Sequence, residues 1–224
     1  MKIAVIGAGK TGGEVVKLLS SEQVAGVYDD FNLPTVEKLK QADVVIIFAP
    51  GSAVAELMPV VLEAKILAVW GSTGFVWPDN LNEQLKKQSV KWIVASNFSL
   101  GMNLIQQCLK VLSKGSKLMD SPSYHIHEVH HIHKKDKPSG TALTWKKWLG
   151  VDCDITAERE GDINGIHELT LKSNFESITL KHEAHSRALF AQGALWAAKY
   201  LFTHSKLEDG LYQFADIVEE ELGL

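Results

Sequence analysis

The stretch KIAVIGAGKTGG, residues 2–13, decides the fold of this chain. An apolar run rich in β-branched residues ends there in glycines, and the amphipathic pattern GGEVVKLLS follows at once. A strand, a glycine-rich turn and a helix start in this order are typical of a dinucleotide-binding unit, because the glycines let a pyrophosphate approach the backbone and let helix and strand pack closely. The turn therefore predicts cofactor contacts at Gly7, Ala8, Gly9, Lys10, Thr11 and Gly12.

Outward from this turn, strand-like and helix-like patterns alternate up to Phe98. The nearly uninterrupted apolar runs and the helical patterns between them lie at 24–30, 42–50, 52–64, 65–73, 78–88 and 91–98. Strands that alternate with helices indicate a parallel sheet covered on both faces. We therefore predict an α/β fold that begins with a Rossmann dinucleotide-binding domain built on a parallel sheet.

The pattern becomes mixed after Phe98 and indicates a smaller α+β domain. Its helices and strands are expected at 100–113, in the histidine-rich stretch that follows, from Ser139 onward, and at 168–173 and 177–182. A long helix over 187–203 and a weakly helical tail over 211–224 come last. We expect the dinucleotide-binding domain to comprise 1–98 and 190–224, and a substrate-binding domain to comprise 99–189.

Asp29 and Asp30 end the second strand, about 20 residues after the glycine turn. A carboxylate at this place hydrogen-bonds the ribose 2′-hydroxyl of NAD and repels the 2′-phosphate of NADP. No arginine lies nearby in the sequence, and Lys10 is the one cation at hand. The cofactor is therefore NADH or NADPH, with NADH favoured. Small polar residues after the fourth and fifth strands predict nicotinamide-side contacts at Gly71, Ser72, Thr73, Ser96, Asn97 and Phe98.

A second informative stretch is EVHHIHKKDKPSGTAL, residues 128–143. Ser139 is a candidate N-cap, because a helical pattern follows it, and the amides of Gly140 and Thr141 would then point out of a helix start. Helix starts bind anions, since their first N–H groups lack internal partners. With Lys134 and several imidazoles beside it, this segment is predicted to hold an anionic substrate and to move protons on it.

The histidines of this segment invite a metal interpretation, which the spacing disfavours. His125 and His127 share one face of the expected strand, and the neighbouring lysines would repel a cation. Cys108 and Cys153 are too far apart in sequence to form a metal knuckle. We predict no metal ligands in this chain.

Composition excludes several classes of partner. The 224 residues are 46% hydrophobic and carry a formal net charge of −4, so neither nucleic acid nor an anionic membrane is expected as partner. No apolar run reaches the ~18 residues that a membrane helix needs. A strand that begins at Lys2 leaves no room for a targeting peptide. Two cysteines do not form a disulfide framework, so we expect a reducing compartment, the cytoplasm.

Together these segments resemble the dihydrodipicolinate reductase family, also called 4-hydroxy-tetrahydrodipicolinate reductases, over nearly the whole chain. The residues that carry the resemblance are the glycine turn at Gly7, GSTGF at 71–75, ASNFSLGMN at 95–103, EVHHIHKKDKPSGTAL at 128–143 and HEAHSRALFAQGA at 182–194. The family usually has glycine where Lys10 stands and often a basic residue where Thr11 stands, which fits a weak NADP preference. The stretch between Trp148 and Ile166 is shorter than in common members, which indicates a compact variant.

The resemblance implies NAD(P)H-dependent reduction of a cyclic, unsaturated imine dicarboxylate, 4-hydroxy-tetrahydrodipicolinate or dihydrodipicolinate, to tetrahydrodipicolinate in lysine and diaminopimelate biosynthesis. It implies that His130 and Lys134 are catalytic. It implies that the small-molecule dicarboxylate is bound by His131, Ser139, Gly140, Thr141 and Arg187. It also implies a homo-oligomer, a homotetramer assembled through the domain over 99–189.

Two other functions remain open from the residues alone. The first is another Rossmann dehydrogenase of amino-acid metabolism, although a semialdehyde dehydrogenase would need an activated cysteine, and neither Cys108 nor Cys153 has an activating neighbourhood in the sequence. The second is a non-enzymatic NAD(H)-sensing protein, which would have no need of the stretch at 128–143. Oxidation of NADH by the dicarboxylate would separate these alternatives.

Overall fold

The computed structural model describes residues 1–224, which divide into two compact units. The first unit comprises Met1–Ser99 and Arg187–Leu224, and the second comprises Leu100–Ser186. The sequence placed these boundaries after 98 and before 190. Helix α7 (Ala188–Thr203) belongs entirely to the first unit, which moves the second boundary back to its start. None of the helices is long and apolar enough to cross a membrane.

The first unit is built on a parallel sheet whose strand order is β10-β5-β4-β3-β1-β2. The strands are β1 (Ile3–Ile6), β2 (Val24–Tyr28), β3 (Val44–Ile47), β4 (Leu67–Trp70), β5 (Lys91–Val94) and β10 (Gly210–Gln213). All residues of β1, β3 and β5 are buried, as expected for strands covered on both faces. The predicted parallel α/β sheet is thereby confirmed.

The tail prediction was wrong in its first part. Residues 210–213 form strand β10 at the edge of the sheet, in parallel register with β5, and only then does helix α8 (Phe214–Glu221) begin. A weak helical pattern over this segment gives way to pairing with β5, because tertiary hydrogen bonding outweighs small local preferences.

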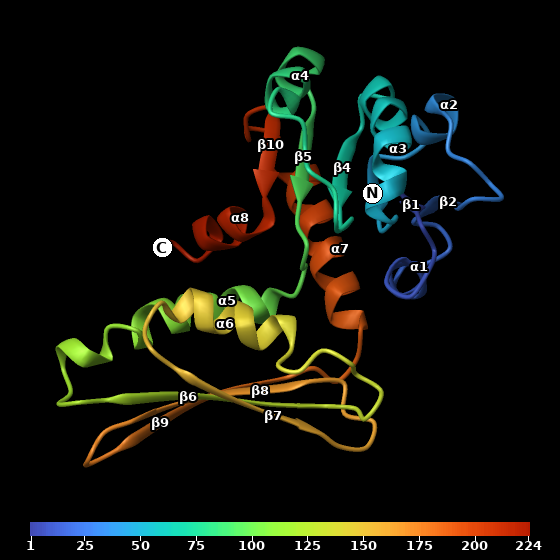
Figure 1. The fold of residues 1–224 in the computed structure, drawn as a ribbon. Coiled ribbons are helices and arrows are strands. Elements are labelled where there is room, and N and C mark those ends of the chain that lie inside the picture. The colour runs from blue at the N-terminus through green and yellow to red at the C-terminus, as the bar shows by residue number, and fades with distance from the viewer. The chain divides into compact units, whose positions relative to one another are not determined.

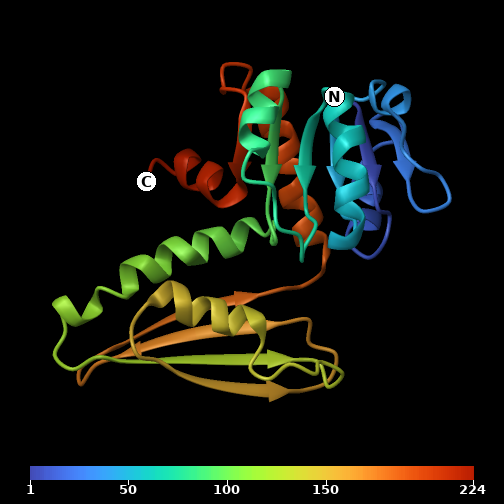
Figure 2. The same ribbon diagram turned by 45° about the horizontal axis from the view of Figure 1, so that its top comes forward.

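Helices lie on both faces of this sheet (Figure 2). They are α1 (Gly12–Leu18), α2 (Val36–Leu39), α3 (Gly51–Glu63), α4 (Leu81–Gln88) and α7. One face packs residues such as Val54 and Leu85 against Ile47, Trp70 and Trp92. This packing fixes the carboxyl ends of the strands, where the loops of the sequence motifs begin.

The second unit is a four-stranded sheet with the order β7-β6-β8-β9 and two long helices on one face (Figure 1). Its elements are α5 (Leu100–Leu112), a short 3-10 helix (Gly115–Lys117), β6 (Ser123–His130), α6 (Gly140–Leu149), β7 (Asp154–Arg159), β8 (Ile166–Lys172) and β9 (Ser177–Glu183). Strand β7 runs parallel to β6, whereas β8 pairs antiparallel with both β6 and β9. This is the smaller α+β part that the sequence predicts.

Along one face of strand β6, the buried side chains change from apolar to polar. Tyr124 and Ile126 are buried in the core that α5 and α6 complete. Because side chains alternate along a strand, Glu128 and His130 continue the same buried face. The apolar packing therefore ends in two buried polar side chains, and the functional groups gather at this end of β6.

Candidate active site

The first unit contains a cavity of about 850 Å³ at the carboxyl ends of its strands. Most residues predicted to contact the cofactor line it: Gly7, Ala8, Gly9, Lys10, Thr11, Asp29, Asp30, Gly71, Thr73, Ser96, Asn97 and Phe98. Two predicted contacts, Gly12 and Ser72, are not among the lining residues, and both are buried. Leu33, Pro34 and Phe48 add apolar surface to the wall.

The glycine turn has the backbone shape that a dinucleotide requires. Gly7 has a φ of 84°, and a Cβ there would lie 2.6 Å from the carbonyl oxygen of Phe48. A Cβ at Gly12 would lie 1.9 Å from the carbonyl oxygen of Gly7, so this glycine allows α1 to pack against the turn rather than to touch a ligand. At Gly9 a Cβ would meet no atom within 4 Å, so the backbone there is open to a phosphate group.

Asp29 has a structural task besides the predicted one. Its Oδ1 accepts hydrogen bonds from the backbone N–H groups of Phe31 and Asn32, each at 2.9 Å, and thereby closes the turn after β2. The sequence treated Lys10 as the one cation at hand, but the structure adds Lys38. The Nζ of Lys38 donates to Asn32 Oδ1 and to the backbone carbonyl of Leu33, both at 3.0 Å, so it holds the same turn.

Arg187 lies in the first unit, immediately before α7, and lines the same cavity together with Phe190. Glu183, four residues before Arg187, forms an ion pair with Lys181 at 2.9 Å. Arg187 is exposed, so its guanidinium is available to a ligand of the cavity.

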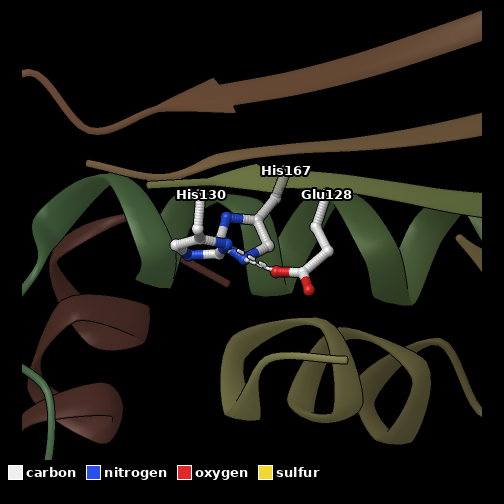
Figure 3. A group of neighbouring side chains, drawn as sticks. All are labelled: Glu128, His130 and His167. Carbon is white, nitrogen blue, oxygen red and sulfur yellow. Dashed lines mark ion pairs between the residues drawn. The ribbon is translucent and has the colours of Figure 1, made fainter. Parts of the chain in front are cut away.

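In the second unit, strand register creates a buried polar cluster. Glu128 stands opposite His167 of β8, and His130 stands opposite Arg159 of β7. The Nδ1 of His130 lies 2.6 Å from Glu128 Oε2, and the Nε2 of His167 lies 3.7 Å from the same oxygen (Figure 3). Arg159 donates from Nη2 to Glu128 Oε1 at 3.2 Å.

The surroundings of this cluster shift its pKa values in different directions. Burial lowers the pKa of His167 to about 4, with a further contribution from His130, so its imidazole is neutral near pH 7. Burial also lowers the pKa of His130, although the carboxylate of Glu128 opposes the shift. Burial works to raise the pKa of Glu128, but hydrogen bonds from Ser139 and the charges of His130 and Arg159 outweigh it and lower that pKa.

The helix start predicted at Ser139 is confirmed, but the predicted role of Ser139 needs correction. Its hydroxyl accepts from the N–H of Ala142 at 3.2 Å and thus caps α6. Its own N–H donates to Glu128 Oε1 at 2.9 Å, and its Oγ lies 3.1 Å from the Nε2 of His167. Ser139 is 1% exposed, so it positions the helix start and does not offer a free group to a substrate.

Lys134 and the first amide of α6 meet on one carboxylate. Lys134 Nζ lies 2.8 Å from Asp136 Oδ1, and the N–H of Gly140 donates to Asp136 Oδ2 at 3.4 Å. Arg159 fixes the backbone of this loop, because it donates to the carbonyl oxygens of both Lys134 and Asp136. Next to them, His131 is half-buried, with its N–H donating to the carbonyl of Ile163.

Glu128, His130 and His167 place three potential metal-ligand atoms within 4.8 Å of one another. The geometry favours a proton over a metal ion at this place. His130 Nδ1 and Glu128 Oε2 form an ion pair at 2.6 Å, and the guanidinium of Arg159 already supplies positive charge to the carboxylate. We therefore keep the prediction of no metal ligands.

Sequence reasoning missed three residues of this cluster: Glu128, Arg159 and His167. Glu128 was read only as part of the histidine-rich segment, and the others lie in the stretch EREGDINGIH at 158–167, which showed no clear pattern. One signal was available, because polar residues at every second position continue the buried face of an apolar strand. Glu128 and His130 satisfy that pattern next to Tyr124 and Ile126.

Both units match described protein families. Residues 1–98 match the family described as dihydrodipicolinate reductase, N-terminus, and residues 101–218 match dihydrodipicolinate reductase, C-terminus. A 4-hydroxy-tetrahydrodipicolinate reductase of Pelagibacter ubique is 33% identical over 222 residues, which is 88% of this chain and 83% of the relative. The protein of that name from Methanosarcina acetivorans is 32% identical over 233 residues, covering 94% of this chain and 85% of the relative.

A solved structure agrees in fold. The dipicolinate-bound dihydrodipicolinate reductase of Paenisporosarcina sp. TG-14 superposes with a TM-score of 0.71 and covers 97% of this chain and 99% of that chain. Its sequence identity is 19%, so this likeness bears on the fold alone. It confirms the predicted combination of a Rossmann sheet with a smaller α+β unit.

Proposed function

Because the chain belongs to the dihydrodipicolinate reductase family, we infer that it is an NAD(P)H-dependent oxidoreductase that reduces a cyclic, unsaturated imine dicarboxylate. The substrate is 4-hydroxy-tetrahydrodipicolinate or dihydrodipicolinate, and the product is tetrahydrodipicolinate. The reaction is a step of lysine and diaminopimelate biosynthesis. The two alternatives left open by the residues, a different Rossmann dehydrogenase and an NAD(H) sensor, lose support from the family match of both units.

One observation carries the substrate assignment. Lys134 and the N–H of Gly140 already hold a single carboxylate between them, that of Asp136. A carboxylate of the substrate can take the place of the Asp136 side chain, since charge-assisted donors and a helix start are what an anion needs when it leaves water. Thr141, the next residue of α6, offers its N–H beside that of Gly140.

The first unit supplies the cofactor-binding part of the proposal. Its glycine turn and strand-end loops surround a cavity whose backbone is open at Gly9, and these features fit a dinucleotide. When bound, the reduced nicotinamide supplies the hydride of the reaction. Asp29 and Asp30 would hold the adenine ribose, and the loops that contain Gly71, Thr73 and Ser96 would hold the nicotinamide side. Arg187, from the same cavity wall, would bind a substrate carboxylate with its planar fork.

NADH is the favoured cofactor in this proposal. Both Asp29 and Asp30 line the cavity after β2, where their charge opposes a 2′-phosphate. Lys38 is committed to the turn through Asn32 and Leu33.

The second unit supplies proton transfer and substrate binding. Hydride addition to the conjugated ring carbon leaves an enamine, whose carbon then accepts a proton. We assign that proton to the dyad of His130 and Lys134, since imidazole exchanges protons near neutral pH and Lys134 also neutralises a carboxylate. His131 stands beside them at the end of β6 and completes the substrate contacts.

Assembly and location complete the proposal. The second unit leaves one face of its sheet without helices (Figure 1). On it, His125 Nε2 and His127 Nδ1 lie 2.8 and 2.9 Å from the same Thr156 hydroxyl. We propose that this face joins copies of the chain into a homo-oligomer, a tetramer. The two cysteines are free thiols, and we propose the reducing cytoplasm as the site of action.

The test of the proposed function is a coupled assay. The dicarboxylate is made in situ by the synthase of the preceding step, and the oxidation of NADH or NADPH is followed by absorbance. We expect oxidation that depends on both proteins, with NADH at least as good as NADPH. No oxidation with the synthase product, together with reduction of NAD⁺ by an amino acid, would favour the other dehydrogenases. Tight NADH binding without any turnover would favour a sensor.

A further inference from the structure

Glu128 is the point on which the polar groups of the second unit converge. Its side chain is fully buried, and it lies two residues before the end of β6, on the face of the strand that points to the core. One carboxylate oxygen, Oε1, accepts from the Ser139 N–H at 2.9 Å and from Arg159 at 3.2 Å. The other, Oε2, lies 2.6 Å from Nδ1 of His130. The same carboxylate therefore touches the imidazole, the guanidinium and the start of α6.

We propose that Glu128 is a positioning residue for His130: its carboxylate holds Nδ1–H, so that Nε2 is the nitrogen that exchanges a proton with the substrate. This inference rests on the proposed function, in which His130 moves that proton. Figure 3 shows the His130 ring with one nitrogen directed at the carboxylate. A carboxylate on one ring nitrogen fixes both the orientation and the tautomer of the other.

The space beside the other ring nitrogen is kept free by a glycine. Gly165 has a φ of 155°, and a Cβ built on it would lie 3.0 Å from Nε2 of His130. That separation is tighter than nine in ten Cβ contacts in proteins, so a larger residue at 165 would press on Nε2. The imidazole of His130 therefore has the carboxylate of Glu128 beside Nδ1 and only the backbone of Gly165 beside Nε2.

The charges around His130 explain why a carboxylate is needed there. Arg159 from β7 and Lys134 from the loop after β6 are cations, and His167 from β8 is a buried neutral imidazole. Burial, Lys134 and Arg159 lower the pKa of His130, and the carboxylate of Glu128 works in the opposite direction. Without the carboxylate, a protonated His130 would face two cations and no counter-charge.

Glu128 also couples the proton donor to the anion site. Because the Ser139 N–H and His130 Nδ1 bind the two oxygens of one rigid carboxylate, the imidazole and the start of α6 hold a fixed mutual position. In the proton step, the N–H bond at Nε2 breaks and its electron pair stays on the ring. The enamine electron pair of the substrate forms the new C–H bond, and the neutral imidazole keeps Nδ1–H on Glu128.

The test compares Glu128→Gln, which removes the charge at nearly constant shape, with Glu128→Asp, which keeps the charge on a shorter arm. The matched control is Glu158→Gln, an exposed glutamate of β7. Ring nitrogen NMR of histidine-labelled protein, assigned with a His130→Gln variant, reports the tautomer and proton affinity of His130. This readout needs no turnover, so it remains informative if the chain fails to reduce the dicarboxylate.

We expect wild-type His130 to carry its proton on Nδ1 in the neutral form. Glu128→Gln should lower its proton affinity at least about tenfold, since an adjacent opposite charge contributes that much or more. In the coupled assay the loss of kcat at high pH should then begin at lower pH, with kcat reduced about 100-fold and the KM for NADH unchanged. Glu128→Asp should recover part of the pH shift, and Glu158→Gln should behave as wild type.

Three outcomes would overturn the inference. One is an unchanged His130 titration and tautomer in Glu128→Gln. A second is a fall in thermal stability accompanied by the same kcat and the same pH profile, which would make Glu128 a purely structural residue. A third is a shift of both the His130 and His167 signals on addition of Zn²⁺ with a rise in Tm, which would make the cluster a metal site. A wild-type enzyme without turnover but with the expected NMR result would refute the proposed function alone.

Discussion

The buried imidazole of His167 makes the stability of this protein acid-sensitive in a way that can be calculated. Burial lowers its pKa from 6.5 to about 4 in the folded protein. Between pH 6.5 and pH 4 the unfolded state binds a proton at His167 and the folded state does not. The contribution of His167 to the unfolding free energy is therefore complete above about pH 6.5 and is lost as the pH falls toward 4. Since one pKa unit corresponds to about 1.4 kcal/mol, the full loss is about 3 kcal/mol.

The perturbation is His167→Gln, which keeps a polar group near Ser139 but removes the titration. Between pH 7 and pH 5, wild type should lose about 2 kcal/mol of unfolding free energy more than the variant does. Urea denaturation at a series of pH values measures this difference, because the contributions of the other groups that titrate are common to both proteins. The control is His133→Gln, which removes an exposed imidazole from the same unit.

Two results would refute the reasoning. Parallel curves of unfolding free energy against pH for wild type and His167→Gln would show that His167 is protonated as easily in the folded state as in the unfolded chain. A variant that loses more stability than wild type in acid would reverse the sign of the argument. A change in the denaturant m value would indicate instead that the unfolded state had changed.

Three further predictions concern ligand binding. Lys134→Ala should lower kcat/KM for the dicarboxylate by about 100-fold or more while NADH affinity, measured by fluorescence titration, stays as in wild type; near-normal turnover would remove Lys134 from the mechanism. Asp29→Asn keeps the Oδ1 that closes the turn after β2 but removes the charge. It should therefore raise kcat/KM for NADPH relative to that for NADH about tenfold. An unchanged ratio would show that another residue selects the cofactor. Arg187→Lys keeps the charge and loses the planar fork, so the KM for the dicarboxylate should rise about tenfold with that for NADH unchanged, whereas a lower Tm with normal KM values would make Arg187 structural.

The sequence allowed the Rossmann part of the fold to be predicted because its signals are local. Strands β1 to β5 of the first unit are short, almost wholly apolar runs between helical patterns, and such runs have few alternatives. Strand β10 was missed for the opposite reason. The residues at 210–213 form a strand only because β5 lies beside them, and no local pattern records that partner.

The candidate site was predictable where one continuous segment forms it and not where strand pairing does. Ser139 could be recognised as a helix cap from the pattern that follows it. By contrast, His167 and Arg159 reach Glu128 and His130 only through the register of β8 and β7 on β6. Strand β7 alternates exposed and half-buried residues, so its pattern resembles that of a polar loop.

The register of β7 also explains how a short connection can preserve the site. The stretch between α6 and β8, which is shorter than the resemblance to the reductase family would lead one to expect, still contains one strand of six residues. Its last residue, Arg159, stands opposite His130 and holds Glu128 as well as the carbonyl oxygens of Lys134 and Asp136. A shift of β7 by a single residue would turn this guanidinium to the open face of the sheet, because side chains alternate along a strand. Glu128 would then be a buried carboxylate without its cation, an arrangement that costs about 3–5 kcal/mol in proteins. Shortening of this stretch is therefore limited by Arg159, whose position the chemistry of β6 requires, rather than by the length of the connection.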